Sequence, residues 1–153
     1  MSTPGVASRP SPIAGLGLFA TQDFMAGERI APYSGATSTR TPAPSTDGRI
    51  YALEVAPGLW LDGSSADNPA RHANHACHPN AELVWHESES AAWLMALRTI
   101  RSGEEITFDY GFSLADSLLH PCACGAPDCV RRIIATPLRP ALRRHLRFSR
   151  PRD

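Results

Sequence analysis

The sequence contains no lysine: its 15 basic side chains, histidines aside, are all arginine, and they balance 15 acidic ones. It also lacks any apolar run near the ~20 residues that a helix needs to cross a bilayer, so we expect no membrane partner. Its first 15 residues carry prolines where a signal peptide needs an apolar stretch. These absences predict a cytoplasmic protein, in which cysteine thiols stay reduced.

Long helical repeats are missing as well, and short strand-like segments take their place. The segments with strand character are 49–55, 58–63, 81–87, 91–97 and 103–111, with a further short strand opening at Ile30. The Pro- and Ser-rich residues 1–12 predict a flexible lead-in, and the polar residues 36–48 predict a surface loop. A chain of 153 residues fits one domain, here of a mainly β class.

Charge is distributed unevenly. Residues 1–130 carry 7 Arg and 14 acidic residues, whereas residues 131–153 carry 8 Arg and Asp153 alone. The spacing of Leu138, Leu142 and Leu146, with Pro140 in a first turn, predicts a short helix in this tail. The tail could pack on its own domain, join a homodimer, or bind nucleic acid or an acidic protein, while the acidic body favours a basic protein partner.

Cysteine is scarce, with four residues in the whole chain, but three of them fall within eight positions. Cys122, Cys124 and Cys129 can curl around one ion, because the intervening GAPD supplies turn residues. A closed structural zinc site needs four ligands, and the only other cysteine is Cys77. The chemistry therefore predicts that the loop at Cys77 returns to the C-terminal cluster and that the four thiolates hold a structural zinc ion.

Other uses of the cysteines stay open at this point. They could be free or redox-active thiols, and His78 or His120 could replace one of them as a ligand. In an all-cysteine site, protein would fill every coordination position, so the metal would hold structure and would not act in catalysis.

Taken in order along the chain, the motifs resemble those of SET-domain protein-lysine methyltransferases. The matching segments are GLGLFA at 15–20, GERIAPYSG at 27–35, Tyr51 with LDG at 61–63, NPARHANHACHPN at 68–80, GEEITFDYG at 103–111 and CACGAPDC at 122–129. The resemblance departs from the family at His72, where Phe is usual.

This resemblance implies a fold and a domain division. The expected fold is a mainly β SET domain of the β-clip type, with several short sheets, a pseudoknot and few short helices. It places the SET domain at 13–113, a post-SET zinc segment at 118–134 and an Arg-rich tail at 135–153. In the family, the cysteine of the Asn-His-x-Cys loop is the fourth zinc ligand, a role that carries over to Cys77.

The implied reaction is transfer of a methyl group from S-adenosylmethionine to a lysine ε-amine. Tyr110 is expected to be the central catalytic group and Tyr33 the second tyrosine of the lysine channel. Phe108 occupies the position that tunes product multiplicity, and its lack of a hydroxyl implies di- or trimethylation. From the residues alone, either tyrosine could instead be a core residue with a satisfied hydroxyl.

The resemblance also implies a cofactor site. Its expected residues are Gly15, Leu16, Gly17, Leu18, Arg71, Asn74, His75 and Tyr110. Arg71 could instead form a structural ion pair, and Asp109 is expected to be structural. Two other functions remain: a non-catalytic SET-fold module that docks on nucleic acid or a protein through the Arg-rich tail, and methylation of a nitrogen other than that of lysine.

Overall fold

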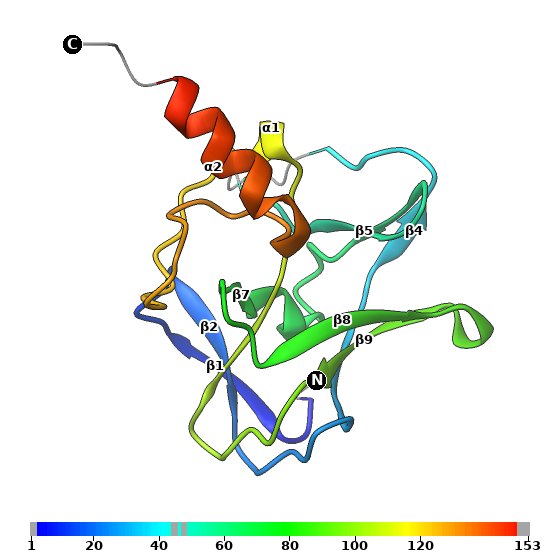
Figure 1. The fold of residues 1–153 in the computed structure, drawn as a ribbon. Helices are drawn as coiled ribbons and strands as arrows, with labels where there is room; N and C mark the ends of the chain where they lie inside the picture. Colours follow the sequence, from blue (N-terminus) through cyan, green and yellow to red (C-terminus); the bar gives the residue numbers. More distant parts are fainter. Residues whose placement is uncertain (1–2, 44–45, 47–48, 150–153) are drawn as a thin grey trace.

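The computed structural model describes residues 3–43, 46 and 49–149, which form three small sheets and short helices (Figure 1). The first sheet has the order β1 (Val6–Pro10), β2 (Leu16–Ala20), β10 (Glu105–Phe108), β7 (Asn74–His75). The second has the order β3 (Arg29–Tyr33), β9 (Ala91–Ala96), β8 (Ala81–His86), and the third the order β4 (Ala36–Ser38), β6 (Leu59–Asp62), β5 (Ala52–Ala56). The mainly β, multi-sheet fold expected from the sequence is confirmed.

The first sheet positions the motifs that carry the chemistry. Strand β10 is antiparallel to β2 and parallel to β7, with Thr107 opposite Asn74 and Phe108 opposite His75. The side chain of Asn80 reinforces this contact: it donates to the Glu105 carbonyl and accepts from the Thr107 N–H. The segments 74–80 and 105–110 therefore lie side by side, as a pseudoknot requires, although the threading itself stays a prediction.

The core lies where the sheets face one another. The largest fully buried side chains include Leu18, Leu94, Ile100 and Ile106, with Phe108 beside them. Strand β9 alternates buried and half-buried residues, as a strand with one covered face should. Strand β10 does not alternate, since Thr107 is also buried, because this central strand is covered on both faces.

Two loop predictions need correction. Part of the expected lead-in 1–12 is strand β1, an edge strand that pairs with β2 from Val6 opposite Ala20 to Pro10 opposite Leu16. Part of the expected loop 36–48 is strand β4, which pairs with β6. Both are short edge strands, and their pairing depends on backbone hydrogen bonds that tolerate polar residues and a terminal proline.

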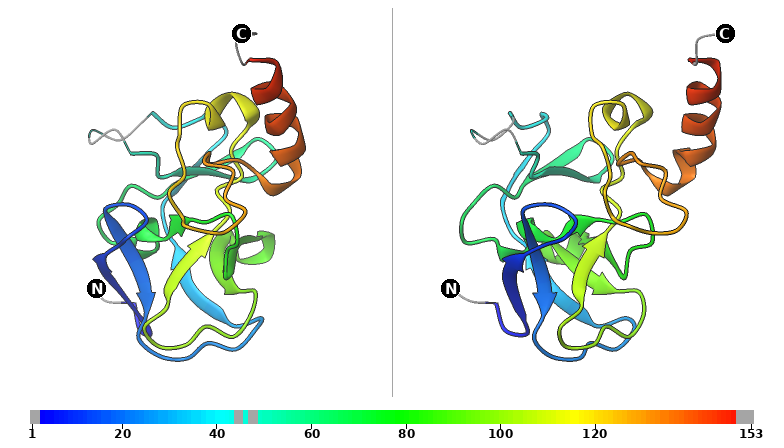
Figure 2. Two further views of the ribbon diagram at one scale, coloured as in Figure 1. Left: turned by 60° about the vertical axis from the view of Figure 1, so that its left-hand side comes forward. Right: turned by 90° about the vertical axis from the view of Figure 1, so that its left-hand side faces the viewer.

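The C-terminal part of the chain consists of helix α1 (Leu114–Ser117), the cysteine segment, a 3₁₀ turn at Thr136–Leu138 and helix α2 (Arg139–Phe148). Two further 3₁₀ turns lie earlier in the chain, at Pro69–His72 before β7 and at Glu87–Glu89 between β8 and β9. The cysteine segment (orange) folds back over the first sheet in both views of Figure 2. The predicted tail helix is confirmed, with Pro140 in its first turn and Leu142 fully buried. Within the described ranges, no helix has the length and apolar character to span a membrane.

Helix α2 is packed on its own domain through Leu142 and Arg139, while Arg143, Arg144 and Arg147 are exposed. Within the part of the chain that the structure describes, these three guanidinium groups make no ion pair. Nucleic-acid binding and dimerisation through this surface stay predictions.

Candidate active site and metal centre

The four cysteines meet although Cys77 lies 45 residues before Cys122. Their sulfur atoms all lie within 4.8 Å of one another, and none forms a disulfide. The Cys77 Sγ is 3.9 Å from the Cys122 Sγ and 3.8 Å from the Cys129 Sγ. Four sulfurs at Zn–S bonds of ~2.3 Å span tetrahedral edges of about 3.8 Å, so the donor set fits zinc.

The two histidines that could have replaced a cysteine lie elsewhere. The exposed His78 pairs through Nε2 with Asp128 at 2.7 Å, and the His120 ring packs on Phe112 with centroids 5.2 Å apart. Among the described residues, the metal-binding group consists of the four thiols. The sequence-based choice of ligands therefore agrees with the geometry.

The environment of these thiols affects their ionisation in opposite directions. Burial raises the pKa of the Cys77 thiol to about 11 and raises that of Cys122 further. Burial acts in the same direction on Cys124, but backbone N–H groups of Cys77 and Ala126 outweigh it and lower its pKa to about 7. A buried set of thiols ionises together only when a cation compensates the charge, as zinc does.

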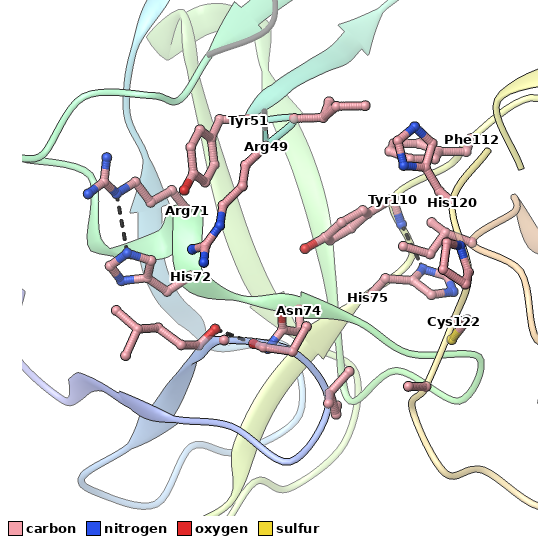
Figure 3. Close-up of a pocket in the computed structure, with 18 residues that line it drawn as sticks. Arg49, Tyr51, Arg71, His72, Asn74, His75, Tyr110, Phe112, His120 and Cys122 are labelled. Atoms are coloured by element: carbon pink, nitrogen blue, oxygen red, sulfur yellow. Dashed lines mark hydrogen bonds between the residues drawn. The ribbon is translucent and has the colours of Figure 1, made fainter. Parts of the chain in front are cut away.

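A cavity of about 480 Å³ opens beside the cysteine cluster (Figure 3). Four stretches of chain form its wall: the turn 13–16, the residues 49–51, the segment 71–75, and the C-terminal residues 110, 112, 120–123 and 133. Cys122, one of the four clustered cysteines, borders the cavity, as do its neighbours Pro121 and Ala123. The metal centre and the cavity therefore form one structural unit.

The structure brings most of the predicted cofactor residues to this cavity but excludes two. Its wall includes Gly15, Leu16, Arg71, Asn74, His75 and Tyr110. Leu18 is fully buried in the core, and Gly17 lies where a Cβ atom would collide with the Glu105 side chain. Neither residue is among those that border the cavity, and contact of a cofactor with the backbone of this segment stays a prediction.

Asn74 and His75 fix the shape of the cavity. The Asn74 amide lies within hydrogen-bond distance of the carbonyl oxygens of Ala14 and Leu16, at 3.1 Å each, and so holds the Gly15 turn. His75 accepts the Tyr110 backbone N–H at 3.2 Å through Nδ1. Burial lowers the pKa of His75 to about 4, so its ring is a neutral acceptor at neutral pH.

Tyr110 lies on a wall shared by two cavities. A second cavity of about 130 Å³ is bordered by Tyr110 and Phe108 and by the side chains of Leu53, Val55, Leu83 and Trp85, with Glu54, Asp109 and Gly111 completing it. The Tyr110 hydroxyl donates to the Ala73 carbonyl at 2.9 Å. Burial raises the pKa of Tyr110, so the phenol stays protonated. A tyrosine with a neutral hydroxyl therefore borders both a large cavity and a small one.

Tyr33, the other predicted catalytic tyrosine, borders neither cavity. It is 4% exposed, its hydroxyl donates to the Tyr51 carbonyl at 2.8 Å, and its ring packs edge-on against Phe108. Gly63 makes room for the phenol, since a Cβ atom there would collide with it. The structure thus places Tyr33 as a core residue with a satisfied hydroxyl, the alternative that the residues alone had offered.

Several residues of the larger cavity were not assigned a role from the sequence, among them Arg49, Tyr51 and Phe112. The Arg71 guanidinium lies 5.4 Å over the Tyr51 ring, and the Phe112 ring is 5.6 Å from that of Tyr110. Tyr51, Leu53 and Val55 alternate along the sequence and are expected on one face of a strand. Tyr51 differs from Leu53 and Val55 in its position directly before β5, where the chain borders the larger cavity.

Comparison with known proteins gives a consistent result. Residues 15–111 match the SET domain family. The chain is 35% identical over 128 residues to the histone-lysine N-methyltransferase trithorax of Drosophila melanogaster, which covers 78% of this chain and 3% of that protein. It is 34% identical over 133 residues to the H3 lysine-4 specific histone-lysine N-methyltransferase of Mycosarcoma maydis, a match that covers 79% of this chain and 9% of that protein. It is also 34% identical over 131 residues to human histone-lysine N-methyltransferase 2D, a match that covers 78% of this chain and 2% of that protein. The chain therefore corresponds to a small part of each of these relatives.

Proposed function

Because this chain belongs to the SET-domain family, we propose that it transfers methyl groups from S-adenosylmethionine to the ε-amine of lysine in another protein. The observation that carries the proposal is the place of Tyr110 on the wall between two cavities. The larger cavity has the size and the mixture of apolar and polar residues for a nucleoside-containing cofactor, and the smaller one, with aromatic and aliphatic residues beside Glu54 and Asp109, suits a lysine side chain.

S-adenosylmethionine, when bound, supplies a methyl group that its sulfonium has already activated. The protein must then hold an uncharged amine in line with that methyl. Phe108, Leu83 and Trp85 form an apolar part of the wall of the smaller cavity, which Glu54 and Asp109 also border. Burial of the lysine amine against this apolar part disfavours its charged form and so lowers its pKa from the usual value of about 10.4. The Tyr110 hydroxyl, fixed by the Ala73 carbonyl, orients the amine at the boundary.

The number of methyl groups transferred is assigned to Phe108. This side chain is 2% exposed, borders the smaller cavity and packs against Tyr110 with ring centroids 4.9 Å apart. A Tyr hydroxyl at this position would fill space next to the amine, which Phe leaves open. We therefore propose that the protein proceeds to di- or trimethyllysine, and that Tyr33 supports the Phe108 ring from behind.

The substrate is proposed to be a basic protein. Residues 1–130 carry 7 Arg and 14 acidic residues, a balance of −7, which favours encounter with a positively charged partner. The relatives named above are histone methyltransferases, and histones fit this description. The metal ion proposed for Cys77, Cys122, Cys124 and Cys129 is zinc, which would hold the C-terminal wall of the cofactor cavity.

A methyl-transfer assay tests the proposal cleanly, because the protein has no lysine of its own. Lysine methylation in the reaction must therefore lie on the added substrate. We expect label from methyl-labelled S-adenosylmethionine to appear on lysines of core histones or similar basic proteins, and mass spectrometry identifies the modified nitrogen. A product on a nitrogen other than that of lysine would contradict the assignment.

A matched pair of tyrosine variants locates the chemistry. Tyr110→Phe should reduce kcat at least about 100-fold, because it removes a hydroxyl that orients the reacting amine. Tyr33→Phe removes a buried hydroxyl outside both cavities and should retain most of the activity. If wild-type protein binds the cofactor without transfer to any lysine, the alternative of a non-catalytic binding module through the Arg-rich tail is favoured.

A further inference from the structure

Helix α2 carries a basic surface that the proposed reaction does not use. Three of its arginines are exposed: Arg143, Arg144 and Arg147. None of them borders either cavity, and within the described part of the chain none forms an ion pair. No acidic residue occurs between Asp128 and Asp153 in the sequence. The helix therefore has no acidic neighbour along the chain to balance its charge.

The opposite side of the helix holds it to the domain. Leu142 is fully buried, and the buried Arg139 guanidinium donates to the Cys77 carbonyl. A turn of 3.6 residues then places the three exposed arginines and Phe148 within one arc of about 140°, on the side away from Leu142. Figures 1 and 2 show the last turns of the helix projecting beyond the sheets, so a large partner can approach this basic arc.

The side chains of the basic arc suit a nucleic acid. A guanidinium keeps its charge at every physiological pH and donates two parallel hydrogen bonds to a phosphate group. Phe148 is 88% exposed and offers a ring on which an unpaired base can stack. Cationic groups beside an exposed aromatic ring are typical of surfaces that bind single-stranded nucleic acid.

Two other anionic partners fit this surface less well. An interfacial helix buries its apolar face in lipid, whereas the apolar face of α2 is packed on its own domain through Leu142. An acidic protein would match the charge of the arginines, but its carboxylates offer no flat ring to stack on Phe148.

We infer that helix α2 binds single-stranded nucleic acid, with its three exposed arginines on phosphate groups and Phe148 against a base. Residues 1–130 have a balance of −7 and repel a polyanion, so the contact is confined to the C-terminal tail. The inference goes beyond the proposed function and does not depend on it. A basic substrate that is itself bound to nucleic acid would be brought to the enzyme in this way.

The test measures binding of the full chain, without cofactor, to a labelled single strand of about 16 nucleotides by fluorescence anisotropy. Three phosphate contacts should contribute about −2 to the slope of log K against log salt concentration between about 50 and 200 mM. The triple variant Arg143→Gln, Arg144→Gln, Arg147→Gln should lose this contribution and bind at least about ten-fold more weakly at the lowest salt. Phe148→Ala should weaken binding of the single strand at least about five-fold and change binding of a duplex little.

A matched triple variant controls for net charge. Arg9→Gln, Arg40→Gln and Arg101→Gln remove the same charge from exposed arginines of the body, and this protein should keep the slope. Replacement of the three α2 arginines by Lys keeps the charge and should keep most of the affinity. Thermal unfolding of each variant separates loss of binding from loss of fold. Arg144→Gln alone, which should reduce the slope by about 0.7, provides the test if the triple α2 variant does not fold.

Three outcomes overturn the inference: wild type does not bind the strand at about 50 mM salt, both triple Gln variants lose affinity equally, or polyglutamate or phosphatidylglycerol vesicles bind as tightly as the strand at the same salt. The last result would assign the basic arc to an acidic protein or to a membrane. Equal affinity for strand and duplex, with no effect of Phe148→Ala, would overturn the contact between Phe148 and a base.

Discussion

The sheets and the C-terminal cap, defined as residues 113–149, are held together by different forces. The sheets bury large apolar side chains such as Leu18, Leu94 and Ile106. Within the cap, Ile134 and Leu142 are the large apolar side chains that are fully buried in the described structure, while Leu119 and Phe148 are 76% and 88% exposed. Burial of apolar area stabilises the sheets, whereas the cap depends on a few polar contacts and on the cysteine cluster.

The contacts that connect the cap to the rest of the molecule include the pair of His78 with Asp128 and three that lie nearer the sheets. The cap cysteines meet Cys77, the Arg139 guanidinium donates to the Cys77 carbonyl, and Thr136 donates to Asp109 through both its N–H and its hydroxyl. The cofactor cavity is lined from both regions. The comparison teaches that the site can be lost while most of the fold survives.

Metal removal should have the largest effect. A chelator, or Cys124→Ser, takes away the cation that compensates the thiolates, so the cap should detach and cofactor binding should be lost. Hydrogen exchange should then rise across residues 118–149 and change little in β3, β8 and β9. Protection of the cap that persists in metal-free protein, with cofactor binding intact, would contradict the role given to the cysteine cluster.

A core substitution should act on the sheets in the opposite way. Leu94→Ala removes a side chain with no exposed surface and should lower the free energy of unfolding by about 2–5 kcal/mol. Metal stoichiometry of the folded protein should stay at one, because no cysteine contact changes. Leu97→Ala, at a side chain that is 47% exposed, is the control and should cost much less in urea denaturation. If the folded Leu94→Ala protein lost its metal ion, the stability of the sheets and the metal binding of the cap would not be independent.

The contact between Asp109 and the cap provides a smaller test. Its Oδ2 accepts both Thr136 bonds at 2.8 Å, and its Oδ1 accepts the Gly111 N–H at 2.9 Å. Asp109→Asn replaces one acceptor oxygen by a donor and should destabilise the cap by about 2 kcal/mol. Hydrogen exchange of residues 135–149 measures the change, with the exposed Asp67→Asn as the control. Equal exchange in the two variants would show that Asp109 does not hold the cap.

The same contrast explains what the sequence could predict. Alternating residues identified the hairpin 81–97, and the need for four zinc ligands brought Cys77 to a cluster 45 residues away. Strand β1 was missed because edge pairing uses backbone groups and leaves little trace in composition. Tyr33 and Tyr51 could not be told apart, since only the tertiary packing decides which ring reaches the cavity. Arg49 opens the segment 49–55 that was expected to be a strand, and alternation along that segment does not show that its side chain borders the cavity.

The smallest expected effect concerns a single hydroxyl. Thr136→Val keeps the shape of the side chain and the backbone N–H bond to Asp109, and it removes only the Oγ1 donor. The loss should be about 1 kcal/mol, measured as the local free energy of opening in the cap by hydrogen exchange. Thr21→Val, at an exposed threonine far from the cap, should change stability by less than about 0.5 kcal/mol. Asp109 directly precedes Tyr110, so a Thr136→Val protein whose cap opens more often should also bind the cofactor more weakly, in proportion to the population with an open cap. If the affinity for the cofactor stayed the same while the cap opened more often, the cap would move without disturbing the cavity.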